Sequence, residues 1–349
     1  MTGRGVIYIG YKCNLRCKFC YYEHEDAKKW QPIEDAKKAA HLYRNHYGLC
    51  AVDITGGEPT IYPNIHELLE YCNKIGLSPT CITNAQVLEK KEVVARFKES
   101  KVNDFLISIH GFGENYDKIT QAKNGFDRLT KAIDNLNSAG ITFRSNTTIT
   151  TSSYKDLKKI AEFVVANNGK VINYISYNPH YDWANITNQD FQVKHSEVRP
   201  YLEDALDYCD AHAVEANVRY FPFCMMPRHK EKCYNFAQIP YDPGEWDFRG
   251  WYSTKLYNPA DKIPDEFYND KNRDAAYYLA ARKQTNAIYA RSPKCEQCAL
   301  KNICDGLTHQ YFNRYGDEEV IIQQGKKINN PTHFLSRSKT LSTWRKTDL

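Results

Sequence analysis

Short apolar runs alternate with amphipathic stretches from residue 5 to about residue 222. Apolar runs of four to eight residues are typical of buried strands, and stretches with apolar residues every three to four positions are typical of helices that pack on one face. This alternation predicts βα units and a parallel sheet. We expect strands at residues 5–10, 51–55, 78–82, 104–109, 142–148 and 171–177, with helices at 33–47, 65–75, 90–98, 126–139 and 154–168.

The rest of the chain has a different pattern. A helix at about 194–215 and a strand at 217–221 are expected to complete the core. Residues 222–272 carry many Pro, Tyr, Trp and Asp residues without a clear period, which indicates a folded loop region. A helix at about 274–291 and a strand near 319–322 follow, and the polar, basic end is expected to be extended.

Composition narrows the class of protein. A chain of 349 residues with 42% hydrophobic and 26% charged residues can bury one large α/β core and a smaller attachment. No apolar stretch approaches the roughly 18 to 20 residues that cross a bilayer, and we expect no secretory leader. The protein is therefore expected to be cytoplasmic, without a membrane partner. We interpret the net charge of +5 as solvated surface, so nucleic acid is not a favoured partner.

The twelve cysteines are better interpreted as metal ligands than as disulfides, because a reducing compartment keeps thiols free. Cys50, Cys72, Cys81 and Cys209 occur singly in apolar or helical contexts, where burial is expected. The remaining cysteines include two compact groups, Cys13, Cys17 and Cys20 and then Cys295, Cys298 and Cys304.

The first group directly follows the first expected strand and has the spacing C-x3-C-x2-C. A cluster used only for electron transfer normally takes four thiolates, so three thiolates suggest a cubane whose fourth iron is open to another ligand. A zinc site is the main alternative because thiolates bind both metals. A simple apolar helix face is less favoured, since polar residues separate the cysteines.

A second motif, Ile-Thr-Gly-Gly-Glu-Pro at residues 54–59, ends the second expected strand, where two glycines permit a sharp bend and close approach to a ligand. With Phe19 before the last cysteine of the loop, the two motifs resemble the radical S-adenosylmethionine (SAM) superfamily. The resemblance implies a partial (β/α)6 TIM-like barrel with a smaller C-terminal cluster-binding extension. It also implies that the open iron chelates SAM, which is cleaved reductively to a 5′-deoxyadenosyl radical.

The resemblance implies roles for further residues. Gly56, Gly57 and Glu58 are expected to contact the methionyl amine, and polar groups at strand ends are expected to bind the carboxylate and ribose. An ordinary turn is the alternative for each strand-end residue. His110 is a weak catalytic candidate that would point into the mouth of the barrel. The expected strand-end residues are Asn84, Ser108 and Asn146, and the candidates for flanking adenine are Phe19 and Tyr21.

The second cysteine group has the spacing C-x2-C-x5-C and is similar to the auxiliary-cluster segments of SPASM and twitch extensions. A full SPASM segment has another cysteine soon after the third, and this chain does not, so we expect one auxiliary [4Fe–4S] cluster. Cys224 is preferred over Cys233 as its fourth ligand, because it follows the last core strand. A zinc knot and unligated core cysteines are alternatives. The expected domains are 1–222 (barrel), 223–325 (auxiliary cluster domain) and 326–349 (basic tail).

The substrate is the least determined feature. Because the first strand is expected to begin by residue 5, we expect no leader-binding domain of the kind that peptide-modifying relatives carry. The aromatic stretches 174–183 and 241–251 could line a pocket for a small polar molecule such as a sugar or nucleoside, although covering the auxiliary cluster is the favoured role for their Trp and Tyr residues. A peptide or protein substrate is the first alternative, and a zinc-stabilised nucleic-acid-binding protein is the second. Oxidative and redox-neutral outcomes both fit, with flavodoxin or ferredoxin as electron donor.

Overall fold

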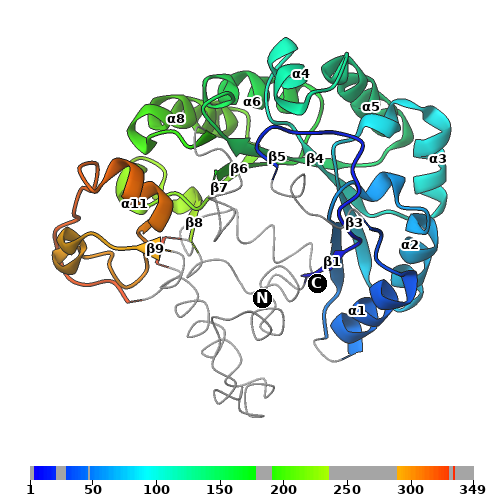
Figure 1. Ribbon diagram of the computed structural model, residues 1–349, viewed down its shortest axis with the longest axis horizontal. Helices are drawn as coiled ribbons and strands as arrows, with labels where there is room; N and C mark the ends of the chain where they lie inside the picture. Colours follow the sequence, from blue (N-terminus) through cyan, green and yellow to red (C-terminus); the bar gives the residue numbers. More distant parts are fainter. Residues whose placement is uncertain are drawn as a thin grey trace. The chain divides into compact units, whose positions relative to one another are not determined.

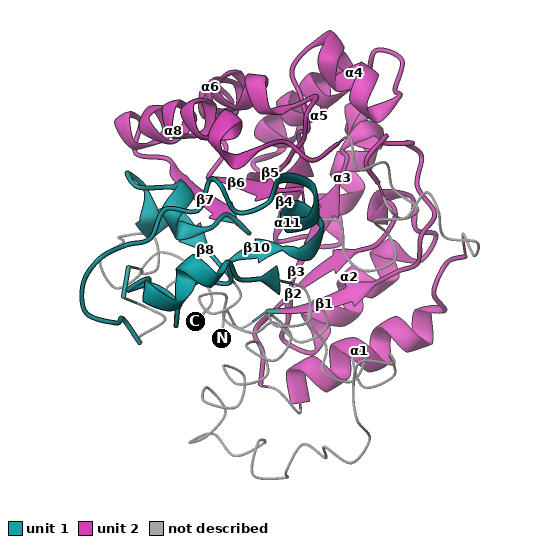
Figure 2. Cartoon of the chain, turned by 60° about the vertical axis from the view of Figure 1, so that its left-hand side comes forward, with its two compact units in different colours: residues 1–4, 219–349 teal, residues 5–218 magenta. Residues whose placement is uncertain are grey.

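The computed structural model describes residues 4–20, 29–45, 48–177, 191–235, 289–329 and 333–334. The chain divides into two compact units. One is Gly5–Val218, and the other consists of Arg219–Leu349 together with Met1–Arg4 (Figure 2). The division falls between Val218 and Arg219, whereas the expected domain boundary after residue 222 stays a prediction.

The larger unit is built around a curved sheet with helices on its outer side (Figure 1). Its strands are neighbours in chain order, and each adjacent pair from β2 to β6 is parallel. The partial barrel expected from the sequence is therefore confirmed. The strands are β1 (Arg4–Tyr8), β2 (Ala51–Thr55), β3 (Ser78–Thr83), β4 (Asp104–Ser108), β5 (Phe143–Ile149), β6 (Val171–Ser176) and β7 (Glu215–Arg219). The helices are α1 (Ile33–Asn45), α2 (Ile65–Lys74), α3 (Lys91–Glu99), α4 (Glu114–Thr120), α5 (Gly125–Ala139), α6 (Leu157–Ala166) and α8 (His195–Ala211).

The helices pack on the sheet through narrow apolar stripes. In α5 the buried residues Leu129, Ala132, Ile133 and Leu136 follow the spacing i, i+3, i+4 and i+7, which places them on one face. The helix ends at Gly140, whose φ of 70° is the left-handed conformation that glycine adopts without strain. The alternation seen in the sequence thus positions the helices on the outer face and leaves the other face of the sheet for a site.

An ionic cluster lies on four neighbouring strands of the sheet. Arg144 of β5 donates from Nε to Oδ2 of Asp104 of β4 at 2.6 Å, and the Thr80 hydroxyl of β3 also donates to Asp104. Asp53 of β2 lies 3.9 Å from the Arg144 guanidinium. Because the Arg144 and Asp104 side chains are each only 11% exposed, this pair links the strands at a site largely removed from water.

The smaller unit contains short elements. Strands β9 (Tyr289–Ala290) and β10 (Leu307–Thr308) pair antiparallel, with Leu307 opposite Ala290. Helix α11 (His309–Tyr315) begins after Thr308, whose hydroxyl accepts the backbone N–H of Tyr311 at 3.1 Å. The other described elements of this unit are η6 (Phe223–Met225), η7 (Lys230–Lys232), β8 (Cys233–Tyr234) and η9 (Pro293–Gln297).

Two expectations for this unit are wrong. The helix expected at 274–291 is not helical at Tyr289–Ala290, which form β9, and its residues 274–288 lie outside the described residues. The strand expected near 319–322 is absent from the described elements: the N–H of Val320 donates to the Asp317 carbonyl in a turn, and Ile321 is 53% exposed. An apolar run forms a strand only where a neighbouring strand accepts its hydrogen bonds.

Candidate functional site

The loop after β1 is held from one side by the glycine pair that follows β2. The N–H of Gly57 donates to the Gly10 carbonyl at 2.7 Å, and the N–H of Glu58 donates to the Lys12 carbonyl at 2.8 Å. A Cβ added at Gly57 would lie 2.0 Å from the Lys12 oxygen, and one at Gly56 would lie 2.3 Å from the Gly10 oxygen. Both positions therefore require glycine because backbone meets backbone there.

Helix α4 holds the same loop from the other side. The N–H of Lys18 donates to the Ile119 carbonyl at 3.0 Å, and that of Arg16 donates to the Thr120 carbonyl at 3.4 Å. These carbonyls belong to the last turn of the helix, whose C=O groups have no partner within the helix itself. Figure 1 shows the loop running from β1 toward the helices that follow β4. The three cysteines of the loop are thus placed by two strand-end segments that follow β2 and β4.

The Cys13 sulfur lies beside the end of β3. It accepts hydrogen bonds from the Leu15 N–H at 3.4 Å and from Nδ2 of Asn84 at 3.7 Å, and Asn84 also donates to Asn14 Oδ1 at 2.8 Å. Desolvation of the sulfur, together with the nearby Glu58 carboxylate, raises the pKa of Cys13 to about 12. The thiol is therefore protonated at neutral pH unless a bound metal displaces its proton.

The donor set of this loop is three thiols, which suits a cubane in which each thiolate binds a different iron. The Cys13 residue keeps exposed surface although protein atoms surround its sulfur, and Cys17 and Cys20 are half-buried. Among the described residues, no group of three or more His, Cys, Asp or Glu side chains converges on a point that would hold a single metal ion. The ligand assignment for Cys13, Cys17 and Cys20 rests on the loop sequence and on its two-sided anchoring, and it stays a prediction.

Glu58 is 1% exposed and accepts hydrogen bonds through both carboxylate oxygens. Oε1 accepts from the Thr60 N–H at 2.9 Å, from the Thr60 hydroxyl and from the Thr83 hydroxyl at 2.6 Å, while Oε2 accepts from the Asn84 N–H at 2.7 Å. Burial raises the pKa of Glu58, and these hydrogen bonds oppose the rise. The carboxylate thus ties the end of β2 to the end of β3, next to the cysteine loop.

Polar side chains form a row across β4 to β7 on the face opposite the helices. Ser108 is paired in register with Asn146, and Asn146 with Asn173. Tyr174, the neighbour of Asn173, donates to the Leu157 carbonyl of α6, so alternation turns Asn173 away from the helices. Nδ2 of Asn217 on β7 donates to Asn173 Oδ1 at 3.3 Å and continues the row.

Two members of the row are available to a ligand. Within the described part of the chain, neither the Ser108 hydroxyl nor the Asn146 amide has a hydrogen-bond partner, and both residues are half-buried. The strand-end positions expected to bind SAM are thus brought together with Asn84 at one edge of the sheet. Their roles stay predictions. Asn173 and Asn217 were not singled out from the sequence, although an asparagine within an apolar strand is an available signal.

His110 follows β4 and is held in one tautomer. Its Nδ1 accepts the Thr148 N–H at 3.1 Å, so the neutral ring carries its proton on Nε2. Burial lowers the pKa of His110 to about 4. The Phe19 ring of the cysteine loop meets the imidazole edge-on, with ring centroids 4.8 Å apart. At neutral pH His110 is therefore a hydrogen-bond donor rather than a general base, and Phe19 contacts it from the loop.

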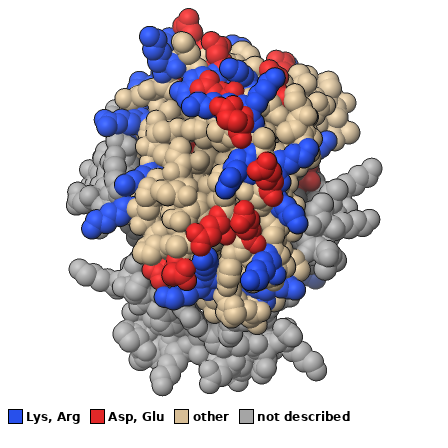
Figure 3. Space-filling view, turned by 90° about the vertical axis from the view of Figure 1, so that its right-hand side faces the viewer, with Lys and Arg blue, Asp and Glu red and all other residues tan. Residues whose placement is uncertain are grey.

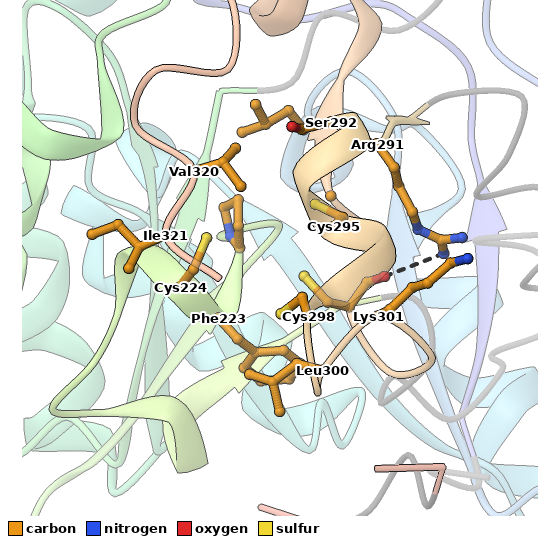
Figure 4. A pocket seen from close by; sticks show the side chains of 14 residues that line it. Phe223, Cys224, Arg291, Ser292, Cys295, Cys298, Leu300, Lys301, Val320 and Ile321 are labelled. Atoms are coloured by element: carbon orange, nitrogen blue, oxygen red, sulfur yellow. Dashed lines mark hydrogen bonds between the residues drawn. The ribbon is translucent and has the colours of Figure 1, made fainter. Parts of the chain in front are cut away.

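A second candidate site is a pocket in the smaller unit. It encloses about 470 Å³ of space, part of it open to solvent, and four cysteines line it. In Figure 4 the labelled sulfurs of Cys224, Cys295 and Cys298 point into this space from two different segments. Cys304 is the fourth lining cysteine. The chain thus brings Cys224 to the second cysteine group across about seventy intervening positions.

The two candidates for the fourth ligand differ in position. Cys233 does not line the pocket; its thiol is fully buried and donates to the His229 carbonyl at 3.5 Å. Cys224 lines the pocket together with Cys295, Cys298 and Cys304. The geometry therefore favours Cys224, and this assignment stays a prediction.

The segment that carries the second group is anchored by its backbone. Cys298 Sγ accepts the Gln323 N–H at 3.3 Å, and Arg291 Nη2 donates to the Cys304 carbonyl at 3.2 Å, the dashed line in Figure 4. Burial, together with the nearby Cys224 thiol, raises the pKa of Cys304 to about 12. Burial likewise raises the pKa of Cys224, with Cys295 and Cys298 as further causes. Four thiols that line one pocket form a donor set suited to an iron–sulfur cluster, in which each thiolate binds a different iron.

Some expected site residues lie outside the described residues. These are Tyr21, the part of the aromatic stretch 174–183 after residue 177, and the whole stretch 241–251. Of the basic tail, residues 326–329 and 333–334 are described.

The face covered by the helices on the right-hand side of Figure 1 has charges of both signs. Figure 3 shows Lys and Arg interspersed with Asp and Glu across the described part of this face. Lys37 contacts both Glu34 and Glu67, and Arg128 contacts Glu89. A nucleic-acid-binding surface needs clustered positive charge, and this face does not provide it.

Within the described residues, no helix has the length and apolar character that a membrane crossing requires.

Comparison with known proteins gives consistent matches. Residues 7–164 match the family model described as "Radical SAM superfamily". Fe-coproporphyrin III synthase of Methanosarcina barkeri is 21% identical over 324 residues, which cover 84% of this chain and 80% of that protein. The antilisterial bacteriocin subtilosin biosynthesis protein AlbA of Bacillus subtilis is 27% identical over 170 residues, 48% of this chain and 37% of that protein.

Among solved structures, Streptococcus suis SuiB bound to S-adenosylmethionine matches with a TM-score of 0.62 and 22% identity, covering 92% of this chain and 76% of that one. SuiB has also been solved bound to the precursor peptide SuiA. At this level of identity the similarity concerns the fold, which extends over both units of the chain described above.

Proposed function

The chain belongs to the radical SAM superfamily, whose members use SAM and a [4Fe–4S] cluster, and on that premise we propose that it removes a hydrogen atom from a small polar substrate. The observation that carries this proposal is the docking of two backbone segments. The glycines after β2 contact the carbonyls of Gly10 and Lys12 so closely that no side chain fits between them. This contact unites the cysteine loop and the Gly-Gly-Glu-Pro turn in one site.

The residues of the larger unit have distinct proposed roles. Cys13, Cys17 and Cys20 would hold three irons of the cluster. The backbone of the Gly56–Gly57 turn and the Asn146 and Ser108 side chains would bind the amino-acid and ribose parts of SAM. Glu58 supports this site indirectly, because its carboxylate oxygens already accept hydrogen bonds from Thr60, Thr83 and Asn84.

When bound, the reduced cluster and SAM supply a 5′-deoxyadenosyl radical. The protein must then exclude water and orient the substrate hydrogen. Phe19 and His110 meet edge-on beside the loop, and His110 is 8% exposed, so this contact closes part of the site against solvent. The Nε2–H of His110 is available to donate a hydrogen bond to a ligand, because Nδ1 already accepts from Thr148.

We further propose one auxiliary [4Fe–4S] cluster held by Cys224, Cys295, Cys298 and Cys304. The pocket that these four residues line supports the proposal. With four thiolates the cluster would have no open iron, which favours electron relay over substrate ligation. A one-electron donor such as flavodoxin or ferredoxin would supply electrons.

A small-molecule substrate is favoured by the relative with the longest match described above. Fe-coproporphyrin III synthase, an enzyme named for a small-molecule product, is aligned with 84% of this chain and with 80% of its own length. A cytoplasmic location is part of the same proposal, because none of the twelve cysteines is paired in a disulfide, which is typical of proteins in a reducing compartment.

A peptide or protein substrate is the second candidate. AlbA is named for the biosynthesis of a bacteriocin, and SuiB has been solved with its precursor peptide. The AlbA match covers only 48% of this chain and 37% of AlbA, however, so it supports a peptide substrate less strongly. A panel that contains both small metabolites and peptides separates the two candidates.

Anaerobic purification followed by metal analysis tests the function. We expect brown protein with about eight irons per chain, equivalent to two [4Fe–4S] clusters. Reduction in the presence of SAM should yield 5′-deoxyadenosine. Cys17→Ala should abolish this product, whereas Cys298→Ala should lower the iron content to about four per chain and stop substrate turnover while some SAM cleavage persists. Zinc in place of iron would contradict the proposal, as would full turnover by Cys298→Ala.

A further inference from the structure

An unpaired acceptor is buried at the far end of the polar row, on β7. Asn217 is 5% exposed, and its Nδ2 donates to Asn173 Oδ1 and to Glu215 Oε1, both at 3.3 Å. Its Oδ1 is buried and has no hydrogen-bond partner among the described residues. Buried polar atoms are nearly always paired, so an orphaned acceptor in a candidate site indicates a missing ligand or water.

The neighbouring groups show that the unpaired atom of the Asn217 amide is its oxygen and not its nitrogen. Nδ2 of Asn173 lies 3.1 Å from the Ser145 carbonyl, which only accepts, so the other atom of the Asn173 amide must be its oxygen. That oxygen and the Glu215 carboxylate both require a donor from Asn217. The nitrogen of Asn217 is therefore assigned, and the remaining atom is an acceptor.

The position of this acceptor separates it from the residues proposed to bind SAM. Ser108, Asn146 and Asn173 are in register on β4, β5 and β6, and Asn217 lies one strand further. Neighbouring strands are about 4.8 Å apart, so Asn217 lies about 10 Å from Asn146 along the row. A cofactor bound at the β4 and β5 positions would therefore leave the β6 and β7 positions to a second molecule.

We propose that the Oδ1 atom of Asn217 accepts a hydrogen bond from an N–H or O–H group of the substrate. This proposal rests on the function proposed above. Asn173 is a positioning residue that fixes the Asn217 amide through the Ser145 carbonyl. The matching substrate group is a donor such as a hydroxyl, amine or amide. A carboxylate or phosphate at this point is excluded because it offers only acceptors. Sites built to pair a donor discriminate strongly against analogues that lack it.

A stimulation assay tests the proposal in the holoenzyme. Anaerobic protein is incubated with SAM, reductant and one of two probes: the fraction below about 3 kDa of an extract from the source cells, or the peptide fraction of that extract. Production of 5′-deoxyadenosine and loss of individual extract components are followed by mass spectrometry. A small-molecule substrate predicts stimulation by the first probe, and a peptide substrate by the second.

The informative variant is Asn217→Leu, which has a similar shape and no acceptor. It should need at least about tenfold more of the active fraction for half-maximal stimulation. Asn137→Leu is the matched control, because Asn137 donates only to the Asn167 carbonyl at an exposed position. It should respond as the wild type does. Equal stimulation of Asn217→Leu and the wild type would overturn the proposal.

A crystal structure of the SAM-loaded wild type at about 1.5 Å resolution provides a test that needs no substrate. The space beside Oδ1 should hold either no ordered water or one that is bonded to Asn217 alone. A water that is also held by two or more other protein groups would assign Oδ1 a structural role and overturn the proposal. Failure of the proposed function is distinguishable, because the wild type would then produce no 5′-deoxyadenosine, while this geometric test still gives its answer.

Discussion

Replacing Glu58 with Gln should break the junction between the Gly-Gly-Glu-Pro turn and β3. Two backbone N–H groups point at different carboxylate oxygens, that of Thr60 at Oε1 and that of Asn84 at Oε2. An amide has only one oxygen. In either orientation of the Gln side chain, one of these N–H groups would face an NH2 group, and that buried donor would have no acceptor.

The expected cost follows from these contacts. A hydrogen bond to a charged acceptor contributes about 1.5–3 kcal/mol, and a buried donor left unpaired costs about 1–3 kcal/mol. Removal of a buried charge offsets part of this loss. The net loss should be roughly 2–4 kcal/mol, which corresponds to a decrease in the unfolding temperature of about 5–10 °C for a domain of this size. Because Asn84 contacts the Cys13 sulfur, the iron content of the loop should fall as well.

The assay compares Glu58→Gln with Glu67→Gln by thermal unfolding of the apoprotein and by iron analysis after anaerobic reconstitution. Glu67 has the same chemistry at a half-exposed position, where it pairs with Lys37 at 2.7 Å. Its replacement should alter neither readout measurably. If Glu58→Gln unfolds at the wild-type temperature and takes up the full iron content, then the buried carboxylate does not hold this junction and the reasoning is refuted.

Three further outcomes are expected. Because the pKa of His110 is lowered to about 4, the free energy of unfolding of the wild type should decrease by about 3 kcal/mol as the pH falls from 6.5 to 4. His110→Gln can still accept the Thr148 N–H and should lose this pH dependence in urea titrations at several pH values. An unchanged pH dependence in this variant would contradict the assignment to His110. Gly57→Ala should bind less iron because its Cβ would lie 2.0 Å from a backbone oxygen. Gly140→Ala, whose Cβ would meet no atom within 4 Å, should bind as much iron as the wild type. Equal iron contents of the two variants would show that the close backbone contact at Gly57 does not support the cysteine loop. Arg144→Met should cost about 3–5 kcal/mol in urea unfolding, because it leaves a buried carboxylate without its cation, and a loss below 1 kcal/mol would contradict that role.

The barrel could be predicted because its elements carry local periodic signals. The apolar spacing in α5 and the short apolar runs of β2 and β4 appear in the sequence as they do in the structure. The smaller unit could not be predicted in this way. Its strands β9 and β10 are two residues long, and α11 is seven residues long, so they are too short for a periodic pattern.

The site shows the same contrast. The cysteine loop and the glycine turn were recognisable because each motif is contiguous in sequence. The orphaned acceptor of Asn217 was not, because it depends on a relay through Asn173 to the Ser145 carbonyl, three strands brought together only by the fold. The tautomer of His110 likewise depends on the Thr148 N–H of a neighbouring strand.

By itself the sequence determined which residue types are available for chemistry and where the strands and helices lie, because spacing and periodicity are local properties of the chain. Tertiary structure decided which of those residues meet. It placed Cys224, and not Cys233, in the pocket of the second cysteine group, and it directed the Glu58 carboxylate to its own protein neighbours. Such choices depend on contacts between distant segments, and these contacts exist only after the chain has packed.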